Sequence, residues 1–329
     1  MDGSGRRALV TGAAGFIGSH LVEALIRDNW SVRCFVRYDS AGTLGFIDTF
    51  PAAIRESLDI RRADLLDENA VDSAAEGVDT IFHLGARISI PYSYASPRDN
   101  FMVNAVGTLN VLEAARNNRV RRIVHTSTSE VFGSAQIIPM SETHPLNAQS
   151  PYAGSKIAAD KLVQSYHRSF DVPAVTVRPF NTFGPRQSPR AVISAIIQQA
   201  LRGDRIRLGA LTPRRDMTFV ADTVAGFQRA AIAEGVEGME FNLGTGEDVS
   251  IGELVERILK AMDLDIPVET DEARIRPANS EVSRLCSDNR LARERLGWTP
   301  ATPLDEGLAG TIAWWRDNQD RFPGTGYAT

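Results

Sequence analysis

The stretch VTGAAGFIGSH, residues 10 to 20, joins an apolar β-type segment to an amphipathic helical pattern and carries three glycines at intervals of three residues. A glycine-rich turn at such a junction lets backbone N–H groups approach a pyrophosphate, and the N-terminus of the helix favours the bound negative charge. Tight packing of a strand on a helix also selects glycine, but the strand before the turn and the helix after it favour dinucleotide binding. The spacing is Gly-x-x-Gly-x-x-Gly instead of the more usual Gly-x-Gly-x-x-Gly. The residues expected to contact the dinucleotide here are Gly12, Gly15, Phe16, Ile17 and Gly18.

Outward from this turn, short β-branched segments alternate with helical patterns through the first half of the chain. This alternation predicts an α/β protein with a doubly wound parallel sheet of Rossmann type, covered by helices on both faces. The expected strands are residues 7–11, 31–36, 59–63, 79–84, 121–126 and 173–178, and the intervening helices include 16–28 and 100–118.

The pattern becomes less regular after about residue 180, where Pro, Gly and Asn mark a loop. One more strand is expected at 239–244, and helices are expected at 191–202, 250–262, 288–296 and 304–318. We therefore expect a dinucleotide-binding domain over residues 1–180, with sheet elements returning at about 214–246. A smaller, interleaved substrate-binding lobe is expected over 181–329.

The overall composition narrows the classes of function. The chain has 329 residues, of which 43% are apolar and 23% charged, and its net charge of −5 argues against a general nucleic-acid binder. Two cysteines, Cys34 and Cys286, fit a reducing compartment. We see no signal peptide, no apolar run of roughly 18 residues, and no histidine pair at metal-ligand spacing. We expect a soluble cytoplasmic protein without a metal, a membrane partner or a nucleic-acid partner.

The end of the second expected strand bears on the choice of dinucleotide. An acid at this place normally bonds the adenosine ribose of NAD, but the sequence here reads Val36-Arg37-Tyr38. The missing acid and the presence of Arg37 favour NADP, although Arg37 could equally be a solvated surface charge. Asp64, after the third strand, is a candidate partner for the adenine amino group or an ordinary helix N-cap.

Tyr152 and Lys156 stand four residues apart in SPYAGSKIAADKL, on one face of an expected helix start. A neighbouring ammonium lowers the pKa of a phenol, so that the phenol can accept a hydroxyl proton while hydride leaves the same carbon. Tyr-x-x-x-Lys alone is common on protein surfaces. The glycine turn upstream and TSTSEVFG at residues 126 to 133, which follows an expected strand, together favour a catalytic role.

The glycine turn, TSTSE, YAGSK, RPFNTFGPR and RRDMTFVADT together resemble the extended short-chain dehydrogenase/reductase family that remodels nucleotide sugars. The motif Ser/Thr-x-x-Glu, here ending at Glu130, followed by Val-aromatic-Gly resembles its 4,6-dehydratase branch. The tail RIRPANSEVSRLCSDNRLARERLGWTP is similar to that of UDP-N-acetylglucosamine 4,6-dehydratases of legionaminic-acid-type pathways.

The resemblance implies a nucleotide-diphosphate sugar as substrate and tightly held NAD(P) as cofactor. It places Leu65, His83 and Ala86 at the cofactor, although His83 could equally be a hydrogen-bonded core histidine. The resemblance implies that the diphosphate and nucleoside contact Asn181, Arg190, Arg215 and Arg276. Relatives pair two long helices, here 99–118 and 153–169, into a homodimer contact.

In such a dehydratase Tyr152 takes the C-4 hydroxyl proton, Thr128 bonds the developing oxygen, and Glu130 removes the C-5 proton before water leaves from C-6. Relatives of the dTDP-glucose type have Thr-Asp-Glu, whereas this chain has Thr128-Ser129-Glu130. Relatives of the GDP-mannose type also have Ser at this place, and this resemblance implies that Glu130 serves as both base and acid. The alternatives are a C-4 epimerase, which has no use for Glu130, a 5,6-dehydratase, and a silent NADP-binding sensor.

Overall fold

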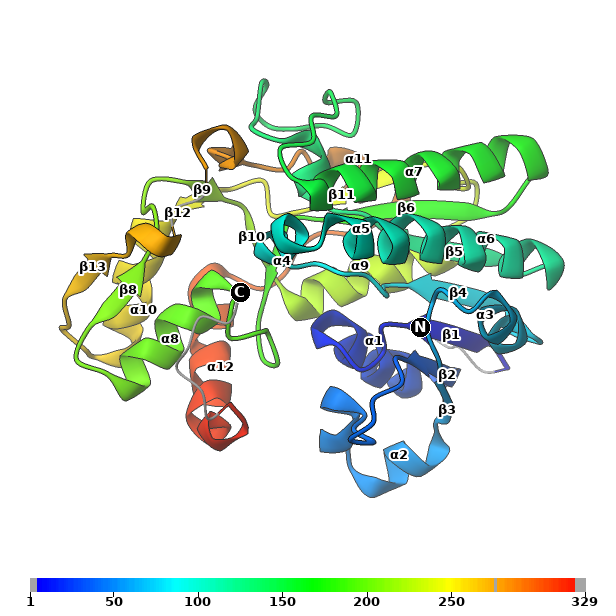
Figure 1. Ribbon diagram of the computed structural model, residues 1–329, viewed down its shortest axis with the longest axis horizontal. Helices are drawn as coiled ribbons and strands as arrows, with labels where there is room; N and C mark the ends of the chain where they lie inside the picture. The colour runs from blue at the N-terminus through cyan, green and yellow to red at the C-terminus, as the bar shows by residue number, and fades with distance from the viewer. Residues whose placement is uncertain (1–4, 275–276, 323–329) are drawn as a thin grey trace.

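The computed structural model describes residues 5–274 and 277–322. Within these residues, the central sheet contains seven parallel strands in the order β11-β6-β5-β4-β1-β2-β3 (Figure 1). Their bounds are β1 Arg7–Thr11, β2 Ser31–Val36, β3 Asp59–Arg62, β4 Thr80–His83, β5 Arg122–Thr126, β6 Ala174–Pro179 and β11 Glu240–Leu243. The strand order reverses at β1, which pairs with both β2 and β4, and ligands of doubly wound sheets bind at such a switch point. The predicted α/β, doubly wound fold is confirmed.

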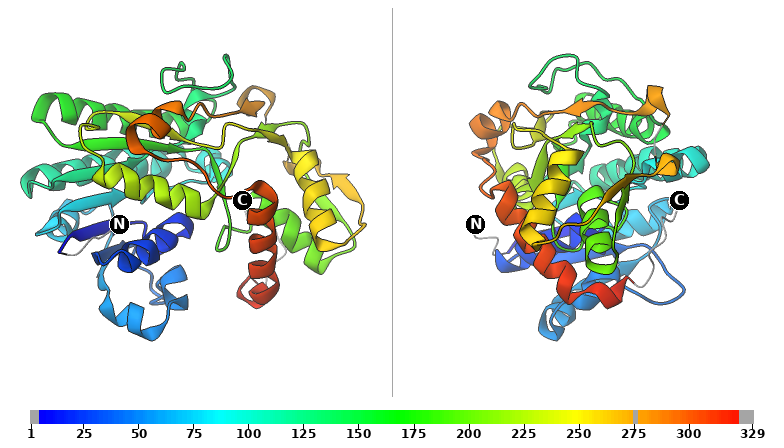
Figure 2. Two further views of the ribbon diagram at one scale, coloured as in Figure 1. Left: turned by 180° about the vertical axis from the view of Figure 1, so that it is seen from behind. Right: turned by 90° about the vertical axis from the view of Figure 1, so that its left-hand side faces the viewer.

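Helices cover both faces of the sheet because successive strand residues point to opposite sides. Leu9 of β1 packs with α3, α6 and α7, whereas Val10 packs with α1 and α9. The two helix layers can be followed in Figures 1 and 2. Their bounds are α1 Phe16–Arg27, α3 Glu68–Ala75, α6 Gly107–Asn117, α7 Pro151–Phe170 and α9 Val220–Ile232, with α11 Arg290–Leu296 beside β11.

The helix expected over 100–118 is not continuous. It divides into α5 Pro97–Phe101, a π-helical turn Met102–Val106, and α6. Within the turn, the Asn104 side chain accepts from the Arg87 N–H at 2.7 Å and donates to the Ser155 hydroxyl at 2.9 Å. These contacts tie the helix to the loop after β4 and to α7, and π-turns of this kind occur frequently at functional sites.

A second group of elements gathers beside the carboxyl ends of the strands, on the left of Figure 1. Ile196, Leu254 and Trp315 form its core, and they belong to α8 Val192–Arg202, α10 Ile251–Met262 and α12 Leu304–Asp317. Three small sheets complete it: β7 Asn181–Phe183 with β10 Met217–Phe219; β8 Ile206–Leu208 with β13 Val268–Thr270; and β9 Arg214–Arg215 with β12 Val249–Ser250 and β14 Arg284–Leu285. The short helix α4 Ile90–Ala95 packs against α5 and α7, and the short helix α2 Ala52–Ser57 lies between β2 and β3 in the chain.

Candidate active site

The glycine turn between β1 and α1 is closed so tightly that side chains are excluded. Gly12 has a φ of +70°, and a Cβ there would lie 2.9 Å from the backbone of Leu84 and Gly85. A Cβ on Gly18 would lie 2.1 Å from the Gly12 carbonyl oxygen. Gly15 is the N-cap of α1 and makes no side-chain cap, so the first amides of the helix, including those of Phe16 and Ile17, have no partner within the helix. This cradle fits a dinucleotide pyrophosphate.

The other residues expected at the cofactor lie along the same edge of the sheet. Arg37 directly follows β2, and Asp64 and Leu65 follow β3. Asp64 accepts from the Leu66 N–H at 2.9 Å and so closes a turn, whereas Asp67 is the N-cap of α3. The buried Leu65 side chain packs against Gly85 and Gly107. Ala86, in the loop after β4, directly precedes Arg87, whose N–H is held by Asn104.

His83 is buried at the end of β4, with both ring nitrogens bonded to protein hydroxyls. The Thr11 Oγ1 accepts from the amides of Leu84 and Gly85, so its own hydrogen goes to Nδ1 of His83 at 2.8 Å. Nε2–H then donates to Thr108 at 3.0 Å, and Thr108 donates to the Asn104 carbonyl. Burial lowers the pKa of His83 well below its ordinary value, so the imidazole is neutral. His83 therefore supports the ends of β1 and β4 beside the cradle.

The structure brings Thr128, Glu130 and Tyr152 together. Thr128 ends the segment after β5 and caps the 3-10 helix η3 Ser129–Phe132, its hydroxyl accepting from the Glu130 N–H at 3.2 Å. Tyr152 lies in the first turn of α7, which begins after the Ser150 cap. Burial raises the pKa of Tyr152 above its ordinary value, the hydrogen bond with Thr128 lowers it, and the nearby charge of Glu130 raises it. Glu130 is half-buried. Its carboxylate charge acts on the Tyr152 phenol.

Lys156 is buried one turn further along α7, on the same side as Tyr152. Its Nζ donates to the Thr126 carbonyl at 2.6 Å. Burial lowers the pKa of Lys156 to about 8, and Asp160 raises it. Because Nζ is bonded to β5 and burial dominates at Tyr152, the expected lowering of the phenol pKa by Lys156 is not found in this structure.

A buried carboxylate that the sequence reasoning missed lies beneath these residues. Asp160 accepts from the Ser127 hydroxyl at 2.6 Å, from Nε2 of His125 at 3.1 Å, and from the Arg178 guanidinium at 3.1 Å. Arg178 also pairs with Glu240 at 2.8 Å. These contacts, led by the hydrogen bond from His125, outweigh burial and hold the pKa of Asp160 below its ordinary value. The signal available in the sequence was its spacing, one helical turn after Lys156.

Two of the expected substrate contacts, Asn181 and Arg215, come close together. The Asn181 N–H donates to the Asp216 carbonyl at 3.0 Å, and the buried side-chain Nδ2 of Asn181 has no protein partner among the described residues, as expected of a ligand-binding amide. Arg215 pairs with Glu281 at 3.2 Å. Arg190 lies exposed on the loop before α8, and no contact in the described part of the chain joins it to Asn181 or Arg215. Arg276 lies outside the described residues.

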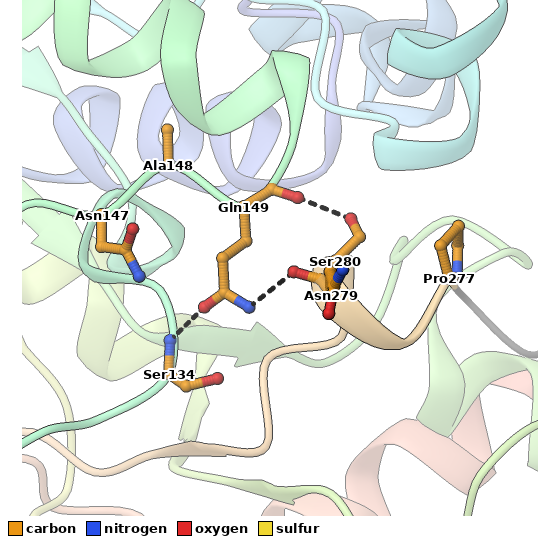
Figure 3. Close-up of a pocket in the computed structure, with 7 residues that line it drawn as sticks. All are labelled: Ser134, Asn147, Ala148, Gln149, Pro277, Asn279 and Ser280. Atoms are coloured by element: carbon orange, nitrogen blue, oxygen red, sulfur yellow. Dashed lines mark hydrogen bonds between the residues drawn. The ribbon is translucent and has the colours of Figure 1, made fainter.

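A pocket of about 540 Å³ lies beside the start of α7 (Figure 3). It is lined by Ser134, Asn147, Ala148, Gln149, Pro277, Asn279 and Ser280. The Gln149 side chain accepts from the Ser134 N–H at 2.5 Å and donates to the Asn279 carbonyl at 3.2 Å, and Ser280 donates to the Gln149 carbonyl at 2.6 Å. These polar groups therefore bond to one another, and they fasten the segment around Ser280 to the residue before the α7 cap.

The cradle at a switch point, with a buried Tyr-x-x-x-Lys pair beside it, defines a dinucleotide-dependent short-chain dehydrogenase/reductase. The family model described as GDP-mannose 4,6 dehydratase matches residues 9–311. UDP-glucose 4-epimerase from Mycolicibacterium smegmatis is 37% identical over 318 residues, covering 94% of this chain and 99% of that protein. A dTDP-glucose 4,6-dehydratase from Streptomyces niveus is 31% identical over 320 residues, covering 95% and 94%.

The fold is also similar to a solved structure of the DesIV double mutant, a dTDP-glucose 4,6-dehydratase from Streptomyces venezuelae with NAD and DAU bound. That similarity has a TM-score of 0.85 at 28% identity and covers 97% of this chain and 100% of that one. The chain belongs to the GDP-mannose 4,6 dehydratase family, within the extended short-chain dehydrogenases/reductases that act on nucleotide sugars as dehydratases or epimerases. The predicted family is confirmed.

Proposed function

We propose that the protein is a nucleotide-sugar 4,6-dehydratase that converts a UDP-hexose, such as UDP-N-acetylglucosamine, into a 4-keto-6-deoxy sugar. The observation that carries the proposal is the position of Glu130. Its carboxylate acts electrostatically on the Tyr152 phenol, and Thr128 hydrogen-bonds to that same phenol. An enzyme that only oxidises and reduces C-4 has no use for a carboxylate there.

Each of these side chains has a role that follows from its surroundings. Tyr152 accepts the proton of the C-4 hydroxyl, and the Thr128 hydroxyl stabilises the phenolate, since this hydrogen bond lowers the phenol pKa. The resulting 4-ketone acidifies the C-5 proton, which Glu130 removes. The protonated Glu130 then donates to the departing C-6 hydroxyl, because Ser129 cannot serve as that acid.

NAD(P), whose pyrophosphate fits the glycine cradle, would supply the hydride acceptor at C-4 and the hydride returned at C-6. Lys156 would hold the nicotinamide ribose from the same face of α7 that carries Tyr152. Asn181 and Arg215 would contact the nucleotide diphosphate, since guanidinium and amide donors suit phosphate oxygens. Arg190 and Arg276 are proposed for the same nucleotide by resemblance alone.

A C-4 epimerase is the second candidate, and the 37% identity to a UDP-glucose 4-epimerase favours it. Epimerisation would require Tyr152, Lys156 and Thr128 only. A 5,6-dehydration would use the same residues as the 4,6-dehydration but would leave an exocyclic double bond in the product.

The reaction in D2O separates these candidates. UDP-, GDP-, dTDP- and CDP-hexoses are each incubated with the enzyme and examined by mass spectrometry and NMR. We expect loss of water from one of them and deuterium at C-5 of a 4-keto-6-deoxy product. An unlabelled C-4 epimer would instead establish the epimerase, and a 5,6-ene would establish the 5,6-dehydratase.

Glu130→Gln tests the assignment of the base, with Ser129→Ala as its neighbouring control. General base catalysis contributes about 10² to 10⁴ in rate, so we expect a loss of that size in water elimination for Glu130→Gln. Ser129→Ala should stay within a few-fold of the unchanged enzyme. Full elimination by Glu130→Gln would contradict the assignment.

We also propose that the protein acts as a homodimer in the cytoplasm. The exposed side chains of Phe101 and Met102 lie on the predicted pairing helices, where a partner could cover them. Cys34 and Cys286 are buried free thiols, which agrees with a reducing compartment. None of the helices in the described ranges is long and apolar enough to cross a bilayer.

A further inference from the structure

Two arginines lie side by side at the carboxyl ends of β2 and β3, on the edge of the sheet that carries the glycine cradle. Arg62 ends β3 and is the register partner of Val36, the residue before Arg37. Adjacent strands are about 4.8 Å apart, so both side chains start from one small area. Both residues are exposed, and within residues 5–274 and 277–322 neither guanidinium has a carboxylate at ion-pair distance. By contrast Arg61, the residue before Arg62, pairs with Asp59 at 2.9 Å.

The loop that follows β2 directs this pair towards the cofactor site. The loop folds back onto the cradle, where the Phe46 N–H donates to the Ala14 carbonyl at 3.1 Å. Arg62 reaches under the same loop, with its Nη1 3.7 Å from the place that a Cβ on Gly42 would occupy. A dinucleotide whose pyrophosphate lies in the cradle has its adenosine ribose at the end of the second strand.

One carboxylate shares this area. Asp39 accepts from the Thr43 hydroxyl at 2.6 Å and from the Ala41 N–H at 3.0 Å. These two hydrogen bonds, followed by the charges of Arg37 and Arg62, hold the pKa of Asp39 below its ordinary value. The carboxylate is therefore ionised at neutral pH and acts on both guanidinium groups without a direct ion pair.

We propose that Arg62 is a second binding residue for the 2′-phosphate of NADP, acting with Arg37, and that the Asp39 carboxylate opposes this phosphate and limits the preference for NADP over NAD. Two guanidinium groups at the ends of adjacent strands can donate to different oxygens of one phosphate. Asp39 repels a phosphate that approaches the same two cations, whereas the ribose hydroxyl of NAD brings no charge. The inference concerns the cofactor alone and holds equally for a dehydratase and for an epimerase.

The test measures the dissociation constants of NADP⁺ and NAD⁺ by isothermal titration calorimetry on the purified full-length chain. The nucleotide that co-purifies with the protein is identified beforehand by mass spectrometry. The variants are Arg62→Ala, Asp39→Asn and, as the control from the adjacent position, Arg61→Ala. Thermal melting of each variant verifies that it is folded, and Arg62→Gln replaces Arg62→Ala if the latter melts early.

We expect the unchanged protein to bind NADP⁺ at least about tenfold more tightly than NAD⁺, as charge-assisted hydrogen bonds to a phosphate provide. Arg62→Ala should weaken NADP⁺ binding by about tenfold or more and leave NAD⁺ binding within twofold. Asp39→Asn should tighten NADP⁺ alone, and Arg61→Ala should change neither constant. The proposal is overturned by a preference for NAD⁺, by equal losses of both dinucleotides in the Arg62 variant, or by an equal loss in the Arg61 control.

Discussion

Asp160 joins the ends of β5 and β6 beside the proposed catalytic residues, through hydrogen bonds and its charge. It is fully buried, and its partners His125, Ser127 and Arg178 come from the ends of β5 and β6. Lys156, one turn earlier on α7, is held more basic by the same carboxylate. A buried carboxylate surrounded by two cations and two hydrogen-bond donors is stable only while all of them are present.

The Asp160→Asn variant should therefore have a lower free energy of unfolding. As the pH rises, its activity should also begin to fall at a lower pH than that of the unchanged protein. Removing one partner of a buried ion pair costs about 3 to 5 kcal/mol. Here the buried Arg178 would lose Asp160 and keep Glu240 as a charge partner. Urea denaturation at pH 7 measures this loss. Asp171→Asn is the control, since Asp171 is exposed at the left-handed C-cap of the same helix, a position that asparagine also tolerates.

The pH dependence gives this prediction a second measurement. The ammonium form of Lys156 is lost as the pH rises through its pKa of about 8. Because Asp160 raises that pKa, the neutral asparagine should move the alkaline limb of kcat/KM to lower pH. An unchanged limb, together with unchanged stability, would show that Asp160 neither supports the fold nor positions the charge of Lys156.

At the scale of single residues, the sequence predicts which side chains of one helix lie on the same face. Tyr152, Lys156 and even Asp160 could be placed on one helix face by their spacing alone. The partners of Asp160 could not, because His125, Ser127 and Arg178 reach it from other strands. The direction of the Tyr152 pKa was also out of reach, since the burial that raises it is a tertiary property.

Between elements, the loop after β7 is fastened to the outer face of α1, the helix whose first turn forms the cradle. Arg186 donates to both carboxylate oxygens of Glu23, at 2.7 and 3.1 Å. Nε2 of His20 is bonded to the Pro185 carbonyl at 2.9 Å. The segment that continues from the proposed substrate residue Asn181 is thus joined directly to the proposed cofactor helix.

A double-mutant cycle on Arg186 and Glu23 should reveal this link. Both side chains are mostly buried, so we expect a coupling of about 1 kcal/mol or more in the free energy of unfolding, measured by urea denaturation of Arg186→Ala, Glu23→Ala and the double variant. The matched control is the exposed pair Arg257 and Asp305, 2.8 Å apart, for which surface ion pairs suggest about 0.5 kcal/mol or less. Equal coupling energies in the two cycles would show that the Arg186–Glu23 ion pair stabilises the fold no more than an exposed ion pair does.

Element boundaries show the same division between local and tertiary information. The strands of the central sheet were predictable to within a residue or two because each is a short segment rich in β-branched or other apolar residues, and most are followed by a helical pattern. The π-turn at Met102–Val106 was not predictable, because nothing in its local sequence departs from a helical pattern. Within this turn, the Asn104 side chain is bonded to Arg87 and Ser155 from other parts of the fold.

Across the whole molecule, the topology gathers the site from distant segments. The switch point at β1 places the cradle next to the ends of β4 and β5, and the second group of elements brings Asn181 and Arg215 to the same edge. The fold class could be predicted from the alternation of segments. The substrate could not be predicted, because loop shape decides it, and loops such as the proposed substrate-binding loop that carries Arg190 have no sequence pattern from which their shape follows.

Oligomeric state belongs to this scale, and the proposed dimer contact is the surface of the helices over residues 99–118 and 153–169. Phe101 is 47% exposed on this surface, at the end of α5. If two copies pair through these helices, light scattering after size exclusion should give twice the chain mass of 35.9 kDa. Phe101→Asp should then elute as a monomer, because each copy would bury an unpaired charge and meet a like charge across the symmetric contact.

The control for this variant is Ile137→Asp, at a side chain that is 68% exposed on the loop between η3 and α7 and does not belong to the pairing helices. It should remain a dimer, because its charge stays in solvent. At equal protein concentration, each variant should melt at the temperature expected for a folded protein of the same oligomeric state. A monomeric unchanged protein, or a Phe101→Asp variant that still forms dimers, would mean that these helices are not the contact. The exposed Phe101 would then be an isolated apolar side chain of the kind that most soluble surfaces carry.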